Sequence, residues 1–303
     1  MFLQDRVAII TGAGRGIGRE HALLFASLGA KVVVNDLGGA VDGSGKDISA
    51  AQSVVDEIQA AGGEAVANTD SVSSFEGAKL MVEQAVSSFG DLHVVVNNAG
   101  ILRDRMLVSM SEEEFDAVIA VHLKGTFNVT RHAADYWRER AKAGTITDRA
   151  VVNTSSGAGL HGNIGQTNYA AAKAGIAAMT VVNAMELNRY GVRANCIAPV
   201  ARTRLTLQTP GMGEPMQNQV FDPENVSPVV AVLASETCPF NGQVFSVYGG
   251  SVGIYAGWSI AESVDSEDRW TPETLAAAME KLPRTVAVNS QIAQLAQHMG
   301  GTG

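Results

Sequence analysis

The sequence predicts an α/β protein built on a parallel sheet with helices on both faces. Short, continuous apolar runs at residues 7–10, 32–34 and 94–96 are typical of strands buried on both faces. These runs alternate with longer helical patterns from the first residues onward, which is typical of a parallel sheet. Because crossovers between parallel strands are right-handed, the expected result is a doubly wound sheet.

The expected elements alternate along the first 250 residues. We expect about seven strands, near residues 7–10, 32–34, 65–66, 94–96, 150–152, 192–197 and 244–247. We expect helices over about 17–29, 48–61, 74–89, 112–142 and 168–190, and a packed helix around the apolar run 229–233. Residues 38–47 are rich in Gly, Asp and Ser, which predicts a loop. In such sheets, ligands bind beyond the carboxyl ends of the strands.

A single domain is expected to span residues 1–260, because no Pro/Ser-rich linker interrupts its first 250 residues. Residues 261–303 contain one helical pattern that begins at Pro272 and places Leu275, Met279 and Leu282 on one face. We interpret these residues as a helical extension of the same domain. Our hypothesis is that they close the substrate pocket or pack on a neighbouring subunit.

Composition excludes several classes of protein. The chain has 303 residues, of which 46% are hydrophobic and 17% are charged, as expected for a globular protein rather than a disordered one. A net charge of −9 argues against a nucleic-acid partner and a polybasic membrane surface. The two cysteines, the absence of a signal-peptide pattern and the absence of a long apolar run predict a soluble cytoplasmic protein with reduced thiols. We expect no metal site.

A glycine-rich turn, TGAGRGIG, begins at Thr11 between the first strand and the first helix. Glycines let the backbone approach a pyrophosphate, and the free N–H groups at a helix N-terminus favour an anion. A purely structural turn is the alternative, but the position at the first strand–helix junction favours a nucleotide. The candidate cofactor-binding residues of this turn are Gly12, Arg15, Gly16, Ile17 and Gly18.

The second strand ends at Asp36, whose carboxylate can accept hydrogen bonds from a ribose and repels a 2′-phosphate. This favours NAD over NADP. Arg15 has the opposite effect if it pairs with a phosphate, but it is equally explained as a solvent-exposed arginine. We therefore predict NAD as the cofactor.

Polar and small residues also follow the third and fourth strands. Asp70 is either an adenine–ribose contact or a turn and N-cap residue. Asn98 is a candidate cofactor contact because Ala99 and Gly100, which follow it, leave room for a ligand at the backbone.

The strongest candidates for catalysis are Tyr169 and Lys173, which lie four residues apart in a helical stretch and therefore on one face. A nearby ammonium favours the phenolate, as does an oxidised nicotinamide, and this brings a phenol toward the range of a general base. Ser156, on the loop after the fifth strand, is placed to hydrogen-bond a carbonyl or a developing alkoxide. Each of these patterns alone arises often by chance.

Taken together, the motifs TGxxxGIG, NNAG, the Ser-Ser loop and Tyr-x-x-x-Lys stand in the order and spacing of the short-chain dehydrogenase/reductase family, which residues 5 to about 255 resemble. The resemblance implies a Rossmann-like domain with one active site. It implies Tyr169 as general acid/base and Ser156 as the carbonyl-orienting hydroxyl. It also implies that Lys173 binds the nicotinamide ribose and lowers the pKa of the tyrosine, and that Gly12, Gly16, Gly18, Asp36, Asp70 and Asn98 contact the cofactor.

His122 departs from the family pattern, which has an asparagine at this place to support a proton relay to the lysine. Imidazole also donates and accepts hydrogen bonds, so His122 is either a relay residue or a buried core residue. In detail, the sequence is similar to the (3R)-hydroxyacyl-CoA dehydrogenase part of peroxisomal-type multifunctional β-oxidation enzymes, which have histidine here. The resemblance implies a stand-alone dehydrogenase for acyl-CoA thioesters, including those with steroid side chains, in fatty acid or steroid degradation.

Alternatives remain open for the substrate. The same fold also serves 3-oxoacyl carrier-protein reductases and steroid or other secondary alcohol dehydrogenases, and a non-catalytic nucleotide sensor is a third hypothesis. Residues 200–220, rich in Pro and Gly, are a plausible mobile lid. Four arginines on loops after strand ends are candidates for phosphate contacts or for ordinary ion pairs: Arg103, Arg105, Arg202 and Arg204.

The helix that follows Tyr169 is rich in Ala on nearly every face, which predicts burial on more than one side. Small residues also let the helix of another subunit approach closely. The family usually associates through this helix, so the resemblance implies a homodimer or homotetramer.

Overall fold

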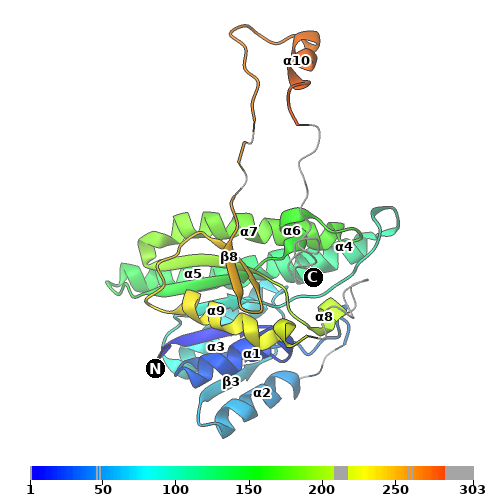
Figure 1. The fold of residues 1–303 in the computed structure, drawn as a ribbon. Helices are drawn as coiled ribbons and strands as arrows, with labels where there is room; N and C mark the ends of the chain where they lie inside the picture. Colours follow the sequence, from blue (N-terminus) through cyan, green and yellow to red (C-terminus); the bar gives the residue numbers. More distant parts are fainter. Residues whose placement is uncertain are drawn as a thin grey trace. The chain divides into compact units, whose positions relative to one another are not determined.

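The computed structural model describes residues 2–45, 47, 49–207, 218–257, 259–260 and 262–283 (Figure 1). Within these residues, eight strands form one sheet in the order β3-β2-β1-β4-β5-β6-β7-β8. All pairs from β1 to β7 are parallel, and β8 pairs with β7 in the antiparallel direction. The strands are β1 (Val7–Thr11), β2 (Lys31–Asn35), β3 (Glu64–Asn68), β4 (Val94–Asn97), β5 (Arg149–Thr154), β6 (Val192–Pro199), β7 (Val244–Tyr248) and β8 (Ser251–Ile254).

The predicted doubly wound sheet is confirmed, and each of its seven predicted strands is present. The eighth strand was missed. Two glycines, Gly249 and Gly250, separate β7 from β8, and a two-residue glycine connection is a recognised hairpin signal that the sequence offered.

Helices cover both faces of the sheet (Figure 1). One hydrophobic core joins the strands to α1 (Gly16–Ser27), α2 (Ser49–Ala60) and α9 (Ser227–Ala234). The other core joins them to α3 (Phe75–Phe89), α5 (Gly125–Lys142) and α7 (Thr167–Leu187). Neighbouring residues of β1 alternate between the cores, with Ile10 in the first and Ile9 in the second. This alternation explains why the strand sequences are apolar without a break.

The stretch at 112–142 was predicted as one helix, and the structure divides it into three elements. α4 (Glu112–Ile119) starts at a capping box made by Ser111 and Glu114. A π-helical turn, η2 (Ala120–Lys124), then leads into α5. Such turns insert an extra residue into a helix and are frequent at functional sites, and this one contains His122.

Short helical segments occupy several of the expected loops. The predicted loop after β5 contains α6 (Gly157–His161), and Ser156 is its N-cap residue. Of the proposed lid at 200–220, residues 208–217 lie outside the described residues. The remaining short elements are η1 (Leu107–Ser109), η3 (Asn188–Tyr190), α8 (Arg204–Leu207), η5 (Gln219–Phe221) and η6 (Pro223–Val226).

The chain divides into two compact units, Met1–Ile254 and Tyr255–Gly303. The first contains the whole sheet. The second contains α10 (Pro272–Met279), which begins at the predicted Pro272 behind a capping box of Thr271 and Thr274. No residue of α10 is buried. The domain boundary at 260 and the role of the extension stay predictions.

None of the helices in the described ranges is long and apolar enough to cross a membrane.

Candidate functional site

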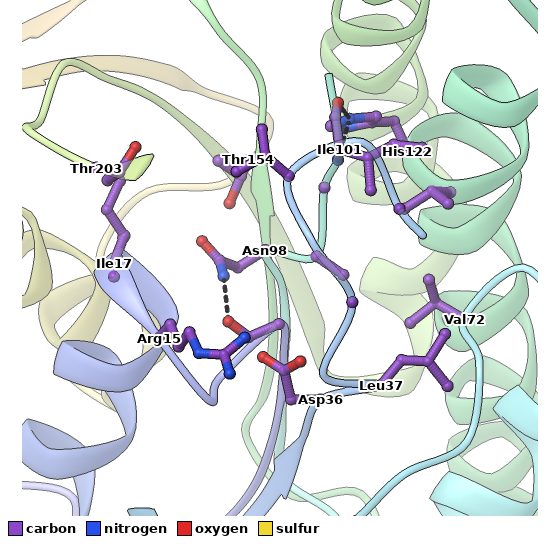
Figure 2. A pocket seen from close by; sticks show the side chains of 18 of the residues that line it. Arg15, Ile17, Asp36, Leu37, Val72, Asn98, Ile101, His122, Thr154 and Thr203 are labelled. Carbon is purple, nitrogen blue, oxygen red and sulfur yellow. Dashed lines mark hydrogen bonds between the residues drawn. The ribbon is translucent and has the colours of Figure 1, made fainter. Parts of the chain in front are cut away.

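A cavity of about 330 Å³ opens at the carboxyl ends of the central strands (Figure 2). It extends from the glycine turn after β1 and Asp36 after β2 to Tyr169 and Lys173 on α7. Most of the residues predicted from the sequence line this cavity: Gly12, Arg15, Gly16, Ile17, Asp36, Asp70, Asn98, Ala99, Gly100, His122, Tyr169 and Lys173. Strands distant in sequence thus bring the predicted cofactor and catalytic residues to one place.

The glycine turn is packed so closely that side chains are excluded from it. Gly12 has φ +65°, and a Cβ there would lie 2.8 Å from the Cα of Ala99. A Cβ at Gly18 would lie 2.2 Å from the carbonyl oxygen of Gly12, so Gly18 serves the packing of α1 behind the turn. Gly16, at φ +56°, faces the cavity and exposes backbone there. Gly12 and Gly18 are therefore needed for close packing, whereas Gly16 exposes backbone to the cavity. The sequence motif alone does not distinguish these two roles.

Asn98 holds the turn in place. Its Nδ2 donates to the carbonyl oxygens of Thr11 at 3.0 Å and Gly12 at 3.2 Å, and the second of these bonds is dashed in Figure 2. Its backbone N–H donates to the Thr11 hydroxyl at 3.0 Å. Asn98 also lines the cavity. Its amide nitrogen is thus committed to the protein, and its amide oxygen is the group that a ligand can use.

Asp36 lies beyond the end of β2, and backbone donors hold both of its carboxylate oxygens. Gly14 N–H donates to Oδ2 at 2.8 Å, and Gly38 N–H donates to Oδ1 at 2.7 Å. Arg15, from the glycine turn, forms an ion pair with Asp47 at 2.6 Å rather than standing free in solvent. Neither of the two interpretations of Arg15 from the sequence included this partner.

Asp70 is tied to the ends of β2 and β3. Asn68 Nδ2 donates to its Oδ2 at 2.8 Å, and Asn35 Nδ2 donates to its carbonyl oxygen at 2.9 Å. Because Asp70 also lines the cavity, the structural and the ligand-facing interpretations of this residue are compatible.

Tyr169 and Lys173 line the other end of the cavity, whereas the predicted Ser156 is not among the lining residues and follows Ser155, which is. Ser156 caps α6, where its Oγ accepts from Ala158 N–H at 3.2 Å, and its hydroxyl is hydrogen-bonded to Tyr169. Lys173 lies one turn after Tyr169 on α7, with its Nζ 5.5 Å from the centre of the tyrosine ring. The Lys173 ammonium donates to the carbonyl oxygen of Thr154 at 2.6 Å. The three side chains thus form one connected group.

The pKa of Tyr169 differs from the expectation. Burial raises the pKa of the phenol to about 12, the charge of Asp104 adds to the rise, and the hydrogen bond with Ser156 opposes it. Burial also lowers the pKa of Lys173 to about 8. In the protein alone, desolvation therefore outweighs the expected effect of the ammonium.

His122 is buried and neutral. Burial, with a contribution from the charge of Lys173, lowers its pKa to about 3. Its Nε2 lies 3.0 Å from the N atom and 2.8 Å from the O atom of Ile101, and its ring packs edge-on to Tyr169 at 5.1 Å. Gly100 is required beside it, because a Cβ there would lie 2.4 Å from the imidazole Cε1. Nδ1 has no partner among the described residues. His122 therefore combines a structural contact with an unused polar atom near the tyrosine.

These residues fit a dinucleotide. The N-cap of α1 makes no side-chain capping hydrogen bond, and the cavity wall beside it is the bare backbone of Gly12 and Gly16. Such a wall suits a pyrophosphate. The Asp36 carboxylate lies at one end of the cavity and the Tyr169–Lys173 pair at the other. This arrangement is what a nucleotide with a reactive ring at its far end requires.

Comparison with known proteins decides the family. The family model for short-chain dehydrogenases matches residues 6–209. The chain belongs to the short-chain dehydrogenase/reductase family. It is therefore an oxidoreductase that acts on CH–OH groups with a nicotinamide cofactor, and the predicted family is confirmed.

Within this family, the chain is similar to several individual proteins. The chain is 46% identical over 289 residues to the hydroxyacyl-CoA dehydrogenase ChsB1 of Mycobacterium tuberculosis, covering 91% of this chain and 88% of that protein. It is 47% identical over 237 residues to peroxisomal multifunctional enzyme type 2 of Drosophila melanogaster, covering 78% of this chain and 38% of that enzyme. The crystal structure of a short chain dehydrogenase from Mycobacterium avium matches with a TM-score of 0.83 at 51% identity, covering 94% of this chain and 98% of that one.

The alternative substrate class is represented by a more distant relative. The 3-oxoacyl-[acyl-carrier-protein] reductase of Thermotoga maritima is 38% identical over 260 residues, covering 83% of this chain and all of that protein.

Contacts that no motif in the sequence indicates fix the start of α7 in this dehydrogenase. Asn168 is buried, and its Nδ2 donates to the carbonyl oxygens of Arg103 and Glu114 at 2.9 and 3.1 Å. Gln166 donates to Asp104 Oδ2 at 2.8 Å, while the other oxygen of Asp104 is buried without a partner in the described part of the chain. The loop after β4 is thereby joined to the helix of Tyr169. The only signal in the sequence was that these polar residues immediately precede the tyrosine.

The arginines considered for phosphate contacts have partners within the protein. Arg103 donates to the carbonyl oxygen of Asp42 at 2.7 Å, and Arg105 pairs with Glu114 at 3.1 Å. Arg202 pairs with Asp222. The side chain of Arg204 lies outside the described residues. For the three described arginines, the structure favours the interpretation as internal contacts and ion pairs.

Proposed function

We propose that this enzyme oxidises (3R)-3-hydroxyacyl-CoA thioesters to 3-oxoacyl-CoA with NAD. The observation that carries the proposal is the pair of Tyr169 and Lys173 at one end of a cavity whose other end is the Asp36 carboxylate, with Ser156 hydrogen-bonded to the Tyr169 phenol. The acyl-CoA class is supported by the similarity to ChsB1 and to the multifunctional enzymes. NAD is supported by Asp36, whose charge disfavours a 2′-phosphate, and by the engagement of Arg15 by Asp47.

The residues have distinct roles in this proposal. Tyr169 takes the proton of the substrate hydroxyl, and Ser156 donates a hydrogen bond to the same oxygen as the carbonyl forms. When bound, the oxidised nicotinamide is the acceptor of the hydride that leaves C3. Lys173 contributes positive charge beside the phenol and is placed to hold the cofactor ribose. Because the pKa of Tyr169 is about 12 in the protein alone, the phenolate needs further positive charge in the assembled complex.

The test is to follow nicotinamide reduction with (3R)- and (3S)-hydroxyacyl-CoA esters of several chain lengths, with NAD and NADP in parallel. We expect turnover of the 3R esters with NAD. Tyr169→Phe should lower kcat by about 10²–10⁴-fold, because it removes the general base without disturbing the ring packing. If NAD binds but no ester is turned over, the acyl-CoA assignment is wrong, and carrier-protein esters or steroid alcohols are the next substrates to test.

We also propose that the enzyme is a homo-oligomer that associates through α7. Three apolar side chains near the end of this helix are exposed in the single chain: Val181, Val182 and Met185, the last at 69%. Clustered exposed apolar residues mark protein interfaces. Light scattering of the purified protein measures the mass directly, and a monomer would contradict this proposal.

A further inference from the structure

We propose that Asp47 is a specificity-determining residue for the cofactor, because it holds Arg15 away from any 2′-phosphate. This inference rests on the proposed use of a nicotinamide dinucleotide. Asp36 disfavours a 2′-phosphate by direct repulsion. Asp47 disfavours it in a second way, because it occupies the guanidinium of Arg15 that would otherwise bind the phosphate. Nothing in the glycine motif indicates it, because Asp47 lies 32 residues after Arg15 in the sequence.

The ion pair lies at the edge of the cofactor cavity. Arg15 and Asp36 both line this end of the cavity, as Figure 2 shows. The guanidinium Nη2 of Arg15 is 2.6 Å from Oδ2 of Asp47, the short distance of a charge-assisted hydrogen bond. An arginine at this place would otherwise be a suitable partner for a phosphate, since guanidinium groups bind phosphates in a fork geometry. The pair therefore uses the group that an NADP site would need.

Asp47 is anchored on its other side. The N–H of Ser49, the first residue of α2, donates to Oδ1 at 3.2 Å, and the Ser49 hydroxyl donates to the same oxygen. The backbone also fixes it, because Ala50 N–H donates to the Asp47 carbonyl oxygen at 3.1 Å. Gly38 packs against this carbonyl so closely that a Cβ would lie 2.0 Å from it. Asp47 thus presents a fixed carboxylate to Arg15.

The charges at this end of the cavity favour a ribose hydroxyl over a phosphate. Two carboxylates, those of Asp36 and Asp47, face one guanidinium. The Asp36 carboxylate is itself held by the N–H groups of Gly14 and Gly38. The side chains of Arg15 and Asp47 are 36% and 44% exposed, so their pair contributes little to folding stability. The main consequence of this ion pair is that it directs the Arg15 guanidinium toward Asp47.

The decisive variant is Asp47→Asn, which removes the charge and keeps an oxygen that can accept from Ser49. The matched control is Asp42→Asn. Asp42 belongs to the same loop and carries the same charge, but its carboxylate accepts from Ser44 N–H at 2.9 Å and from the Ser44 hydroxyl at 2.7 Å. The readout is the Kd of NADH and of NADPH, measured by nucleotide fluorescence without substrate. Thermal unfolding of each variant shows whether the fold is retained.

We expect the ratio of the Kd for NADPH to that for NADH to fall by about two- to fivefold in Asp47→Asn, the range that the loss of an exposed ion pair allows, and to stay near the wild-type ratio in Asp42→Asn. The double variant Asp47→Asn/Arg15→Gln should return to the wild-type ratio, because the better binding of NADPH in Asp47→Asn requires the freed guanidinium of Arg15. Arg15→Gln alone should not lower the ratio, because it leaves the Asp47 carboxylate without its counter-charge. A fall of the ratio in this variant would overturn the role of Asp47, and this test does not depend on the stability of Asp47→Asn.

An unchanged ratio in Asp47→Asn, an equal fall in Asp42→Asn, or a gain that persists in the double variant would overturn the role of Asp47. Failure of the wild-type protein to bind either nucleotide would instead overturn the proposed function itself.

Discussion

The two edges of the central sheet use their polar side chains in opposite ways. At the amino edge, carboxylates form ion pairs with three arginines, of which Arg6 and Arg149 are buried: Arg149 lies 2.9 Å from Asp91, and Arg6 and Arg193 lie 3.0 and 2.7 Å from Asp148. The Nε of Arg6 is buried without a hydrogen-bond partner in the described residues, so the pairing at this edge is not complete. At the carboxyl edge, polar atoms face the cavity or lie near it without partners in the described chain: the Nδ1 of His122, the Oγ1 of Thr154 and the Oδ1 of Asp104. The same strands thus carry a stabilising edge and a reactive edge.

This difference indicates where substitutions affect stability and where they affect chemistry. Removing one partner of a buried ion pair destabilises the fold, because it leaves the other charge buried and uncompensated. Buried groups without partners cost free energy in the protein alone, and they are retained where a ligand can use them. Substitutions at each edge and the response to acid test this division.

Arg149→Ala at the amino edge should lower the free energy of unfolding by about 3–5 kcal/mol, the usual cost of breaking a buried ion pair. Arg149 is 1% exposed and donates to Asp91, which also accepts from the Tyr136 hydroxyl at 2.8 Å. Urea unfolding measures the change. The fraction that stays folded should keep the kcat/KM of the wild type, since the site lies at the other edge.

The matched control for this experiment is Arg131→Ala. Arg131 pairs with Asp135 at 2.8 Å on the surface of α5, where both side chains are about 40% exposed. The expected change in stability is about 0–1 kcal/mol. Equal losses in the two variants would show that the amino edge has no special role.

His122→Ala at the carboxyl edge should cost about 1–3 kcal/mol, because it removes the Nε2 that either accepts from the N–H of Ile101 or donates to its carbonyl oxygen, according to the tautomer. His122→Gln should restore most of this loss, since an amide can accept from Ile101 N–H and donate to the Ile101 carbonyl. Thermal unfolding of both variants, together with their kcat values, separates the two roles. If the glutamine variant is stable but its kcat is strongly reduced, the imidazole itself serves the reaction. If it keeps the wild-type kcat, the role is structural.

Acid should destabilise the enzyme before its carboxylates titrate. Burial lowers the pKa of His21 and of His122 to about 3, whereas both are near 6.5 in the unfolded chain. The unfolded state therefore binds more protons below pH 6.5, and stability falls as the pH drops from about 6.5 toward 3. The slope is about 1.4 kcal/mol per pH unit for each histidine.

Urea unfolding at pH 7, 6 and 5 tests this slope. His21 contributes one of the two protons that the unfolded chain takes up. His21→Gln should therefore remove about half of the slope of the free energy of unfolding against pH that the two histidines cause together. A free energy of unfolding that stays constant over this range would contradict the burial of both rings.

Local patterns predicted the elements well and the contacts between elements poorly. The apolar runs identified seven strands because a strand buried on both faces is apolar at every position, as Ile9 and Ile10 show. The motifs identified the residues that line the cavity because backbone requirements at Gly12 and the helical spacing of Tyr169 and Lys173 are local properties. The π-helical turn around His122 was invisible, because its helical pattern continues that of α4 and α5.

The sequence by itself determined the parallel sheet, the glycine turn at the end of β1 and the membership of a dehydrogenase family. Only the tertiary structure decided what those residues contact. The ion pair between Arg15 and Asp47 and the contacts of Asn168 join segments that are distant along the chain or lie on different elements. The high pKa of Tyr169 has the same origin, because desolvation depends on everything packed around a group and not on its neighbours in sequence. The spacing of a motif identifies the side chains of a site, and the tertiary contacts determine which of those side chains are already hydrogen-bonded or ion-paired within the protein.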